Sequence, residues 1–235
     1  MANVTTIPIV ALDYPDTDAA MRLVRTLAGR CRFYKVGSEL FTAAGPEIVE
    51  RVRDAGADVF LDLKFHDIPN TVRGATRSAA ALGVRLLTVH AAGGLDMLRA
   101  AAEGAEQRIG VLAVTVLTSF DDASLARATG RPGLAASEEV ARLAGVAAES
   151  GIHGIVCAGT DVAAVRARFE DRLAFLVPGI RLRGGASHDQ RRVVTPAEAA
   201  RMGATYIVIG RAVTAAEDPA GAMAAVHADL GSIAA

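Results

Sequence analysis

The chain has 235 residues, of which 51% are hydrophobic and 4% aromatic, and its formal net charge is −1. Balanced charge with scattered basic residues excludes the concentrated positive surface that nucleic acids and anionic membranes require. Segment 1–8 lacks a basic region followed by a long apolar run, and no stretch reaches the length of a membrane span. We therefore expect a cytoplasmic protein without a nucleic-acid or membrane partner.

Short apolar, β-branched runs alternate with stretches of helical periodicity along the whole chain. The predicted strands, in chain order, are Ile7–Asp13, Phe33–Gly37, Val59–Lys64, Leu86–His90, Ile109–Leu117, Gly154–Ala158, Ala174–Pro178 and Tyr206–Gly210. The predicted helices between them include Asp18–Ala28, Gly45–Ala55, Thr71–Leu82 and Glu138–Ser150. Strands that alternate with helices form parallel sheets, and this length favours a closed (β/α)8 TIM barrel over an open sheet. No linker divides the chain, so we expect one α/β domain spanning residues 1–235.

Polar residues gather at the carboxyl ends of the predicted strands, which in such barrels form the catalytic face. They are Asp13, Lys35, Asp62, Lys64, Thr118 and Arg211. A network of ion pairs that only braces the barrel is the alternative explanation. The convergence of several charges on one rim favours a catalytic role.

The third strand carries the densest group of charges. The two-residue period of a strand points Asp62 and Lys64 to the same side, into the barrel mouth. Pro69 ends the strand, so Asp67 lies in the following loop, where it can reach the mouth or a neighbouring subunit. Together with Lys35 and Asp13, these residues predict an alternating array of lysine and aspartate whose pKa values are coupled.

The loops after the last two strands predict a phosphate site, as is usual in these barrels. Gly210 lets a backbone amide approach a phosphate, and the Arg211 guanidinium offers paired donors. Arg181 and Gln190 belong to a glycine-bearing loop that suits closure over a ligand. A second long loop begins at Thr118 and contains a possible short helix at Leu125–Thr129, which suggests a lid.

Metal and cofactor motifs are absent from the sequence. Cys31 and Cys157 lie far apart, with neither metal-ligand spacing nor a disulfide framework, and the five histidines form no close cluster. We therefore expect buried, reduced cysteines and neither a metal nor an organic cofactor.

The run Asp62–Thr71 resembles the signature of the orotidine 5′-monophosphate decarboxylase family. Its Asp-x-Lys-x-x-Asp core also occurs in related barrels such as 3-keto-L-gulonate 6-phosphate decarboxylase and hexulose phosphate synthase. The continuation Ile-Pro-Asn-Thr is typical of the orotidylate branch. Further segments resemble bacterial members: Ala11–Asp13, Tyr34–Gly37, Val89–Gly94, Val116–Ser119, Pro178–Arg181, Asp189–Arg192 and Ile209–Arg211.

The resemblance implies decarboxylation of orotidine 5′-monophosphate (OMP) to uridine 5′-monophosphate (UMP) in de novo pyrimidine biosynthesis. It implies that Lys64 is the proton donor, with Lys35, Asp62 and Asp67 completing the charged array. It places Asp13 and Thr71 on the ribose, Thr118 on the pyrimidine edge, and Arg181, Gln190, Gly210 and Arg211 on the phosphate. It further implies a homodimer in which Asp67 and Thr71 act across the interface.

Two other functions fit the residues. One is a magnesium-dependent sugar-phosphate decarboxylase or aldolase of the same superfamily, in which Asp62 and Asp67 help to hold the ion. The other is a catalytically silent phosphate-binding regulator, in which the same charges serve recognition and assembly. Metal dependence distinguishes the first, and tight nucleotide binding without turnover the second.

Overall fold

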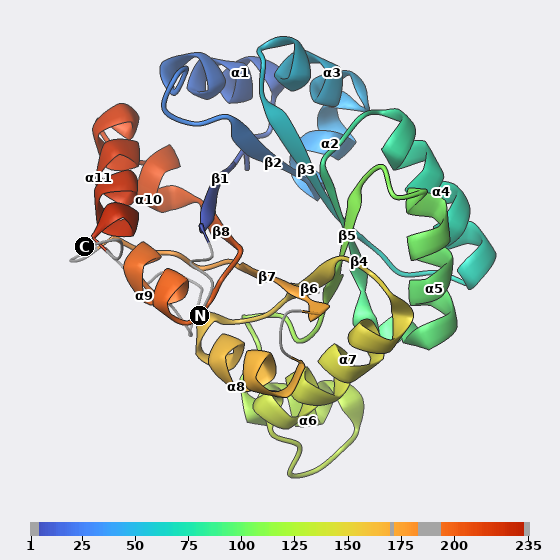
Figure 1. Cartoon of the computed structure of the whole chain (residues 1–235). Helices are drawn as coiled ribbons and strands as arrows, with labels where there is room; N and C mark the ends of the chain where they lie inside the picture. Colours follow the sequence, from blue (N-terminus) through green and yellow to red (C-terminus); the bar gives the residue numbers. More distant parts are fainter. Residues whose placement is uncertain (1–4, 170–171, 183–193, 233–235) are drawn as a thin grey trace.

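A computed structural model describes residues 5–169, 172–182 and 194–232 of the chain. Its strands close into a parallel barrel in the order β1 to β8, with β8 pairing back onto β1 (Figure 1). The strands are β1 (Ile7–Ala11), β2 (Phe33–Gly37), β3 (Asp58–Phe65), β4 (Leu86–His90), β5 (Gly110–Val114), β6 (Gly154–Val156), β7 (Ala174–Val177) and β8 (Tyr206–Ile209). The predicted (β/α)8 architecture is confirmed.

The helices form a ring outside the barrel (Figure 1). They are α1 (Thr17–Thr26), α2 (Ser38–Ala44), α3 (Glu47–Asp54), α4 (Pro69–Ala81), α5 (Gly94–Ala105), α6 (Asp122–Thr129), α7 (Ala136–Ser150), α8 (Gly159–Phe169), α9 (Pro196–Arg201), α10 (Arg211–Thr214) and α11 (Pro219–Gly231), with the short 3-10 helix η1 (Ala91–Gly93). Among the described residues, none of these helices has the length and apolarity needed to cross a bilayer.

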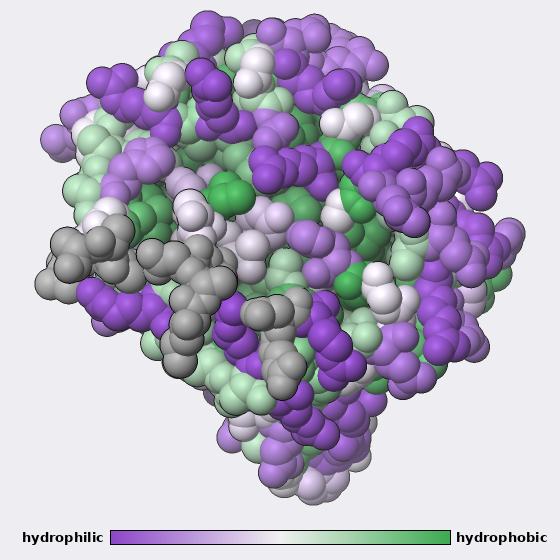
Figure 2. Space-filling view, viewed as in Figure 1, coloured by the Kyte–Doolittle hydropathy of each residue, from purple (hydrophilic) through white to green (hydrophobic). Residues whose placement is uncertain are grey.

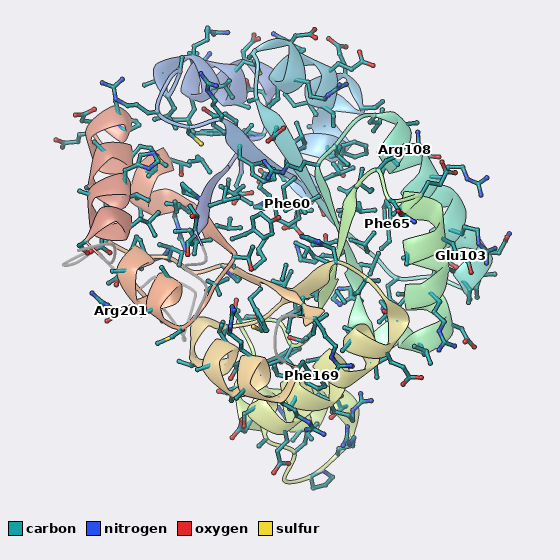
Figure 3. All side chains as sticks on the ribbon, viewed as in Figure 1. Phe60, Phe65, Glu103, Arg108, Phe169 and Arg201 are labelled. Atoms are coloured by element: carbon teal, nitrogen blue, oxygen red, sulfur yellow. The ribbon has the colours of Figure 1, made fainter. Side chains whose placement is uncertain are left out.

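The apolar residues form two layers because every strand is covered on both faces. Along β1, Ile9 and Ala11 belong to the barrel interior, whereas Val10 packs in the outer layer against the helices. Phe60 lies in the middle of the barrel (Figure 3) and is 1% exposed. Hydrophilic side chains gather mainly over the surrounding helices (Figure 2). This two-sided burial explains why the strands read as continuous apolar runs.

Most predicted elements differ from the structure at their ends by one to three residues, and three of these differences bear on the site or on the helix ring. The first strand stops at Ala11, two residues before the predicted end. The fifth stops at Val114, and the next residues turn along the barrel mouth. The region predicted as one helix at Gly45–Ala55 is α3, preceded by α2, which the periodicity did not show. The predicted short helix at Leu125–Thr129 is confirmed within α6.

Helices α4 and α5 pack closely against each other, with α4 on β3 and α5 on β5. A side chain at Gly104 on α5 would place its Cβ 2.4 Å from the Arg73 carbonyl oxygen of α4. The two helix backbones therefore approach each other at a position where only a hydrogen fits. Helix α4 in turn packs on β3, the strand that carries Asp62 and Lys64.

We predict that Gly104→Ala lowers the free energy of unfolding by about 1–3 kcal/mol, because the added methyl group forces these helices apart. Gly145→Ala on α7 is the matched control, since its Cβ meets only Phe169 at 3.5 Å. The control should raise the free energy of unfolding by up to about 1 kcal/mol through helix propensity. Urea denaturation of both variants checks the prediction, and equal effects at the two glycines would contradict it.

Candidate active site

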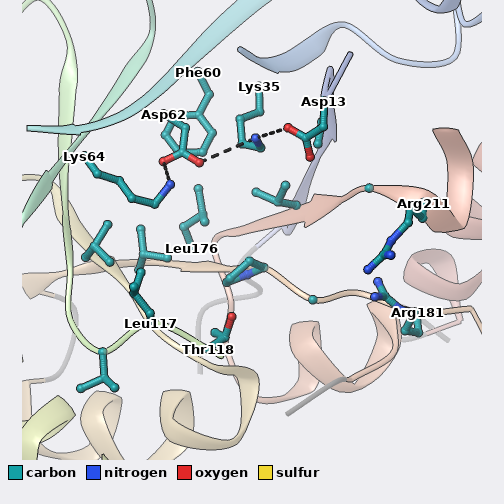
Figure 4. Close-up of a pocket in the computed structure, with 18 residues that line it drawn as sticks. Asp13, Lys35, Phe60, Asp62, Lys64, Leu117, Thr118, Leu176, Arg181 and Arg211 are labelled. Atoms are coloured by element: carbon teal, nitrogen blue, oxygen red, sulfur yellow. Dashed lines mark hydrogen bonds and ion pairs between the residues drawn. The ribbon is translucent and has the colours of Figure 1, made fainter. Parts of the chain in front are cut away.

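A cavity of about 290 Å³ opens at the carboxyl ends of the strands (Figure 4). Its apolar wall is formed by Ala11, Phe60, Val114, Val116, Leu117, Val156, Leu176, Pro178 and Val208. Its polar lining is formed by Asp13, Lys35, Asp62, Lys64, Thr118, Gly179, Arg181, Gly210 and Arg211. An apolar cavity with a few convergent polar groups is the usual form of a small-molecule site.

Four charged side chains run along one wall of the cavity in alternating sign. Lys64 Nζ donates to Asp62 Oδ1 at 2.8 Å, and Asp62 Oδ2 lies 3.7 Å from Lys35 Nζ. Lys35 Nζ donates in turn to Asp13 Oδ1 at 2.7 Å. The dashed lines of Figure 4 follow this path. The predicted alternating array is therefore continuous from β3 to the end of β1.

Asp62 is the central carboxylate of this array. Burial by itself raises the pKa of Asp62, but the positive charges of Lys35 and Lys64 and hydrogen bonds from Lys64 and Thr88 bring the pKa below its usual value. Attraction by the two ammonium groups therefore outweighs desolvation. Asp62 is ionised at neutral pH, although its side chain is only 13% exposed.

The backbone between Asp62 and Lys64 departs from the regular pleat that the sequence predicts. Leu61 pairs with Leu87 of β4, but the next pair is Phe65 with Val89, so β3 contains extra residues at this point. Lys64 has a φ of 51°, in the left-handed region. Both side chains still line the cavity, but they reach it from a bulge.

Gly37 at the end of β2 leaves room for the array. A Cβ there would lie 2.9 Å from Lys35 Nζ and 3.3 Å from Asp13 Oδ1. Any larger residue would displace the ammonium group from its carboxylate partner. Glycine at position 37 therefore leaves room for the ion pair between Lys35 and Asp13. Its φ is not positive, so the backbone conformation does not itself require glycine.

The opposite end of the cavity is cationic. The side chains of Arg181, after β7, and Arg211, after β8, point toward each other in Figure 4. Gly210 is the N-cap residue of α10, and Thr118 lines the cavity from the loop after β5. The sequence predicts Arg181, Gly210 and Arg211 as phosphate ligands, and the structure places these three residues together.

Two predicted site residues that the structure describes do not line the cavity of this chain. Asp67 is exposed between β3 and α4 and accepts the Ile68 backbone N–H at 2.7 Å. Thr71 is exposed in the first turn of α4. Gln190 lies outside the described residues.

One sequence signal was missed. Lys35 and Lys64 are the only lysines in a chain that has 25 lysine and arginine residues together. Both line the cavity and touch the same carboxylate. A residue type confined to one site marks that site, so a simple count of residue types would have identified these two.

The remaining titratable group beside the array is His90, at the end of β4. Burial lowers the pKa of His90, and electrostatic interactions with His66 and Lys64 lower it further, whereas Asp62 raises it. The imidazole is therefore neutral at neutral pH and adds no charge to the wall. Within the described part of the chain, no three His, Cys, Asp or Glu side chains gather as a metal site.

We predict that Asp62→Asn lowers the free energy of unfolding at neutral pH by about 1–4 kcal/mol. This range lies between the small loss when one partner of an exposed ion pair is removed and the large loss for a buried pair. The pKa of Asp62 is lowered in the folded state, so its contribution is present above the unfolded value and is lost as the pH falls through the folded value. The difference from wild type should therefore shrink as the pH falls below about 4. Denaturation at several pH values measures it.

Asp58→Asn is the matched control on the same strand, because Asp58 forms an exposed ion pair with Arg85 at 2.6 Å. It should lower the free energy of unfolding by no more than about 1 kcal/mol. A difference between wild type and Asp62→Asn that stays constant down to acid pH would contradict the electrostatic origin.

Comparisons with known proteins agree with this geometry. The sequence profile of the "Orotidine 5'-phosphate decarboxylase / HUMPS family" matches residues 6–226. A protein of Halorhodospira halophila named orotidine 5'-phosphate decarboxylase is 51% identical over 227 residues, which cover 94% of each chain. One of the same name from Anaeromyxobacter dehalogenans is 53% identical over 222 residues, covering 94% of this chain and 96% of the relative.

Similarity of structure points the same way. The crystal structure of orotidine 5'-phosphate decarboxylase from Lactobacillus acidophilus superposes with a TM-score of 0.85 at 34% identity, covering 96% of this chain and 99% of the other. The profile match and these relatives both extend over nearly the whole barrel. The chain therefore belongs to the orotidine 5′-phosphate decarboxylase / HUMPS family.

Proposed function

We propose that the barrel decarboxylates OMP to UMP in pyrimidine biosynthesis and that Lys64 protonates the product carbanion. The carbon–carbon bond from ring carbon 6 to the carboxylate breaks, carbon dioxide leaves, and the electron pair stays on carbon 6. This pair lies in the ring plane, where the π system does not delocalise it. Stabilisation must therefore come from a preorganised positive charge.

The observation that carries this proposal is the restriction of lysine to the cavity. All the other lysine and arginine positions of the protein are arginine. A guanidinium stays protonated at any ordinary pH, whereas an ammonium group can give up a proton. Lysine at position 64 therefore suits a group that must first pair with a carbanion and then protonate it.

Asp62 acts on the substrate through its negative charge. It is ionised, it is buried, and Lys64 holds it at 2.8 Å on the cavity wall. A substrate carboxylate placed beside it is repelled in the ground state, and loss of carbon dioxide relieves that repulsion. Lys64 meanwhile gains a second anionic partner on carbon 6, so the array favours the transition state over the bound substrate.

The cationic end of the cavity binds the phosphate group. Arg181 and Arg211 supply guanidinium donors, which match phosphate oxygens in pairs. Gly210 permits a close backbone approach, and we assign Gln190 of the preceding loop to the same group. Thr118 contacts the pyrimidine edge and Asp13 the ribose. Binding energy from the phosphate holds the ring against Lys64 and so contributes to turnover as well as to affinity.

We further propose that the site is completed in a homodimer. Asp67 and Thr71 lie at the exposed start of α4, next to Ile68, which is 67% exposed. A second copy packed on this surface would bury Ile68 and bring the Asp67 carboxylate to the other cavity. Asp67 then extends the alternating array beyond Lys64, and Thr71 reaches the ribose.

The arrangement does not favour a magnesium-dependent sugar-phosphate reaction. Both oxygens of Asp62 face ammonium groups, Oδ1 toward Lys64 and Oδ2 toward Lys35. Asp67 is turned to its own backbone outside the cavity. The proposed chemistry needs no cation beyond the two lysines. A single barrel domain in the cytoplasm fits this reaction, and two buried cysteines that form no disulfide suit a reducing compartment.

We predict chelator-resistant loss of OMP absorbance with the purified protein. Lys64→Ala should lower kcat by at least about 1000-fold, because it removes both the positive charge and the proton donor. Lys64→Arg should lower kcat nearly as far, since it keeps the charge but holds its proton. Arg99→Ala removes a positive charge from the exposed surface of α5 and should leave kcat unchanged.

Three results would contradict the assignment. Turnover of Lys64→Arg near the wild-type rate would remove the proton-donor role while sparing the electrostatic one. Wild-type activity that chelator abolishes would favour the magnesium-dependent alternative, and tight UMP binding without turnover would favour a regulator.

We predict that a heterodimer of one Lys64→Ala chain and one Asp67→Asn chain, purified through two affinity tags, recovers about half the wild-type turnover per dimer. One of its cavities carries both substitutions and the other carries neither. Each homodimer should be nearly inactive. A heterodimer of Lys64→Ala and Asp62→Asn is the control, because each cavity then carries one substitution and no activity returns. An inactive Lys64/Asp67 heterodimer would place Asp67 in its own protomer's site.

A further inference from the structure

Thr88 is the one hydroxyl-bearing residue within β4, whose sequence is Leu-Leu-Thr-Val-His. Its relative exposure is 0%, and it is absent from the residues that line the cavity. It therefore lies behind the wall, where substrate does not reach it. A buried hydroxyl costs free energy unless it is hydrogen-bonded, so its partners show what it does.

Both partners of Thr88 belong to the charged array. The Thr88 hydroxyl donates to Asp62 Oδ1 at 2.9 Å and accepts the Lys64 backbone N–H at 3.0 Å. One hydroxyl can do both because it has one donor and two acceptor sites. Thr88 thus joins the side chain of one member of the array to the backbone of the next.

These bonds lie at the bulge of β3. The interruption of pairing falls between Leu61 and Phe65, opposite Thr88. Lys64 has a left-handed φ of 51°, which costs a non-glycine residue about 1 kcal/mol or more. The bulge takes the Lys64 amide out of regular strand pairing, and the Thr88 hydroxyl accepts it instead. The hydroxyl therefore stabilises a backbone conformation that lysine does not favour.

The second bond fixes the carboxylate. Asp62 Oδ1 accepts from the Thr88 hydroxyl and from Lys64 Nζ, which holds the carboxylate plane and leaves Oδ2 toward Lys35. Figure 4 shows the resulting path from Lys64 through Asp62 to Lys35. Rotation of the carboxylate would break both ion pairs of Asp62 at once.

We propose that Thr88 is a positioning residue that sets the Lys64 ammonium group for the reaction by fixing the β3 bulge and the Asp62 carboxylate together. It contacts no substrate atom. This inference rests on the proposed decarboxylation, because it assigns the geometry on which Lys64 depends. A displacement of about 1 Å at a reacting group can lower turnover about 100-fold, so a single buried hydroxyl can have a large effect.

Thr88→Val is the direct test, because valine keeps the shape and removes both hydrogen bonds. We predict that kcat falls about 10- to 100-fold while KM changes less than about threefold, since the phosphate end of the cavity is untouched. Thr88→Ser restores the hydroxyl and should return kcat to within about threefold of wild type. Thr88→Cys offers only a weak donor, and it replaces the valine variant if that protein does not fold.

Thr205→Val is the matched control. The Thr205 hydroxyl also accepts a backbone N–H of a neighbouring strand, that of Phe175 at 3.1 Å, but it precedes β8 at the opposite end of the barrel. Its loss should lower stability without changing kcat of the folded protein. A purely structural role of Thr88 predicts the same behaviour for both threonines.

A spectroscopic measurement reports the array directly. Protein labelled with carbon-13 at the lysine ε-carbon gives two side-chain signals, because the chain has two lysines. Lys64→Arg assigns them by removing one. Thr88→Val should shift the Lys64 signal in the absence of substrate, and Thr88→Ser and Thr205→Val should leave it in place.

The outcomes separate the two proposals. If wild-type protein does not decarboxylate OMP, the proposed function fails, and the lysine spectra still test whether Thr88 positions Lys64. If wild type is active and Thr88→Val retains kcat within about twofold, or leaves the Lys64 signal unmoved, the positioning role is overturned alone. Equal losses in the serine, cysteine and valine variants would overturn it as well.

Discussion

The site depends on closure of the barrel, because closure fixes where every strand ends. Pairing of β8 with β1 completes the ring and brings the carboxyl ends of all the strands to one rim. Asp13 follows β1, Lys35 lies on β2 and Asp62 lies on β3, yet neighbouring partners are 2.7 Å and 3.7 Å apart. No single strand could hold charges in this order. The interior layer around Phe60 keeps the ring filled and so keeps these distances fixed.

The alternation of positive and negative charge allows the central side chains of the array to remain charged although they are largely buried. Lys35 is 11% exposed and Asp62 is 13% exposed, so each pays a desolvation penalty that a single pair offsets poorly. Each shares its charge with two partners of opposite sign, and the pKa of Asp62 falls despite burial. The array therefore keeps the Asp62 carboxylate ionised beside two lysine side chains, which is the arrangement that the proposed reaction uses.

The sequence predicts what depends on local pattern. Eight apolar runs and polar residues at their ends were enough for the barrel, the rim and most of the cavity's polar lining. The bulge of β3 was missed because it depends on how β3 pairs with β4. The two-residue period correctly placed Asp62 and Lys64 on the cavity side, but it assumed a regular strand and not a bulge. Thr88 was missed with it, since a threonine in a strand is unremarkable until its partners are known. Asp67 and Thr71 are exposed outside the cavity of their own chain, and their proposed roles require a second copy, which a local sequence pattern does not describe.

The formal charge of the array links assembly to chemistry. Within one protomer, two ammonium groups and the carboxylates of Asp13 and Asp62 sum to zero. Lys64 ends the chain of ion pairs and is 35% exposed, so it has room for one more anionic partner. An Asp67 carboxylate from a second copy would make the array negative beside the substrate carboxylate and would give Lys64 a second ion-pair partner. A dimer contact of this kind would strengthen the repulsion between the array and the carboxylate of the bound substrate, and it would place Lys64 between two carboxylates. Assembly would therefore affect kcat more than it affects substrate affinity.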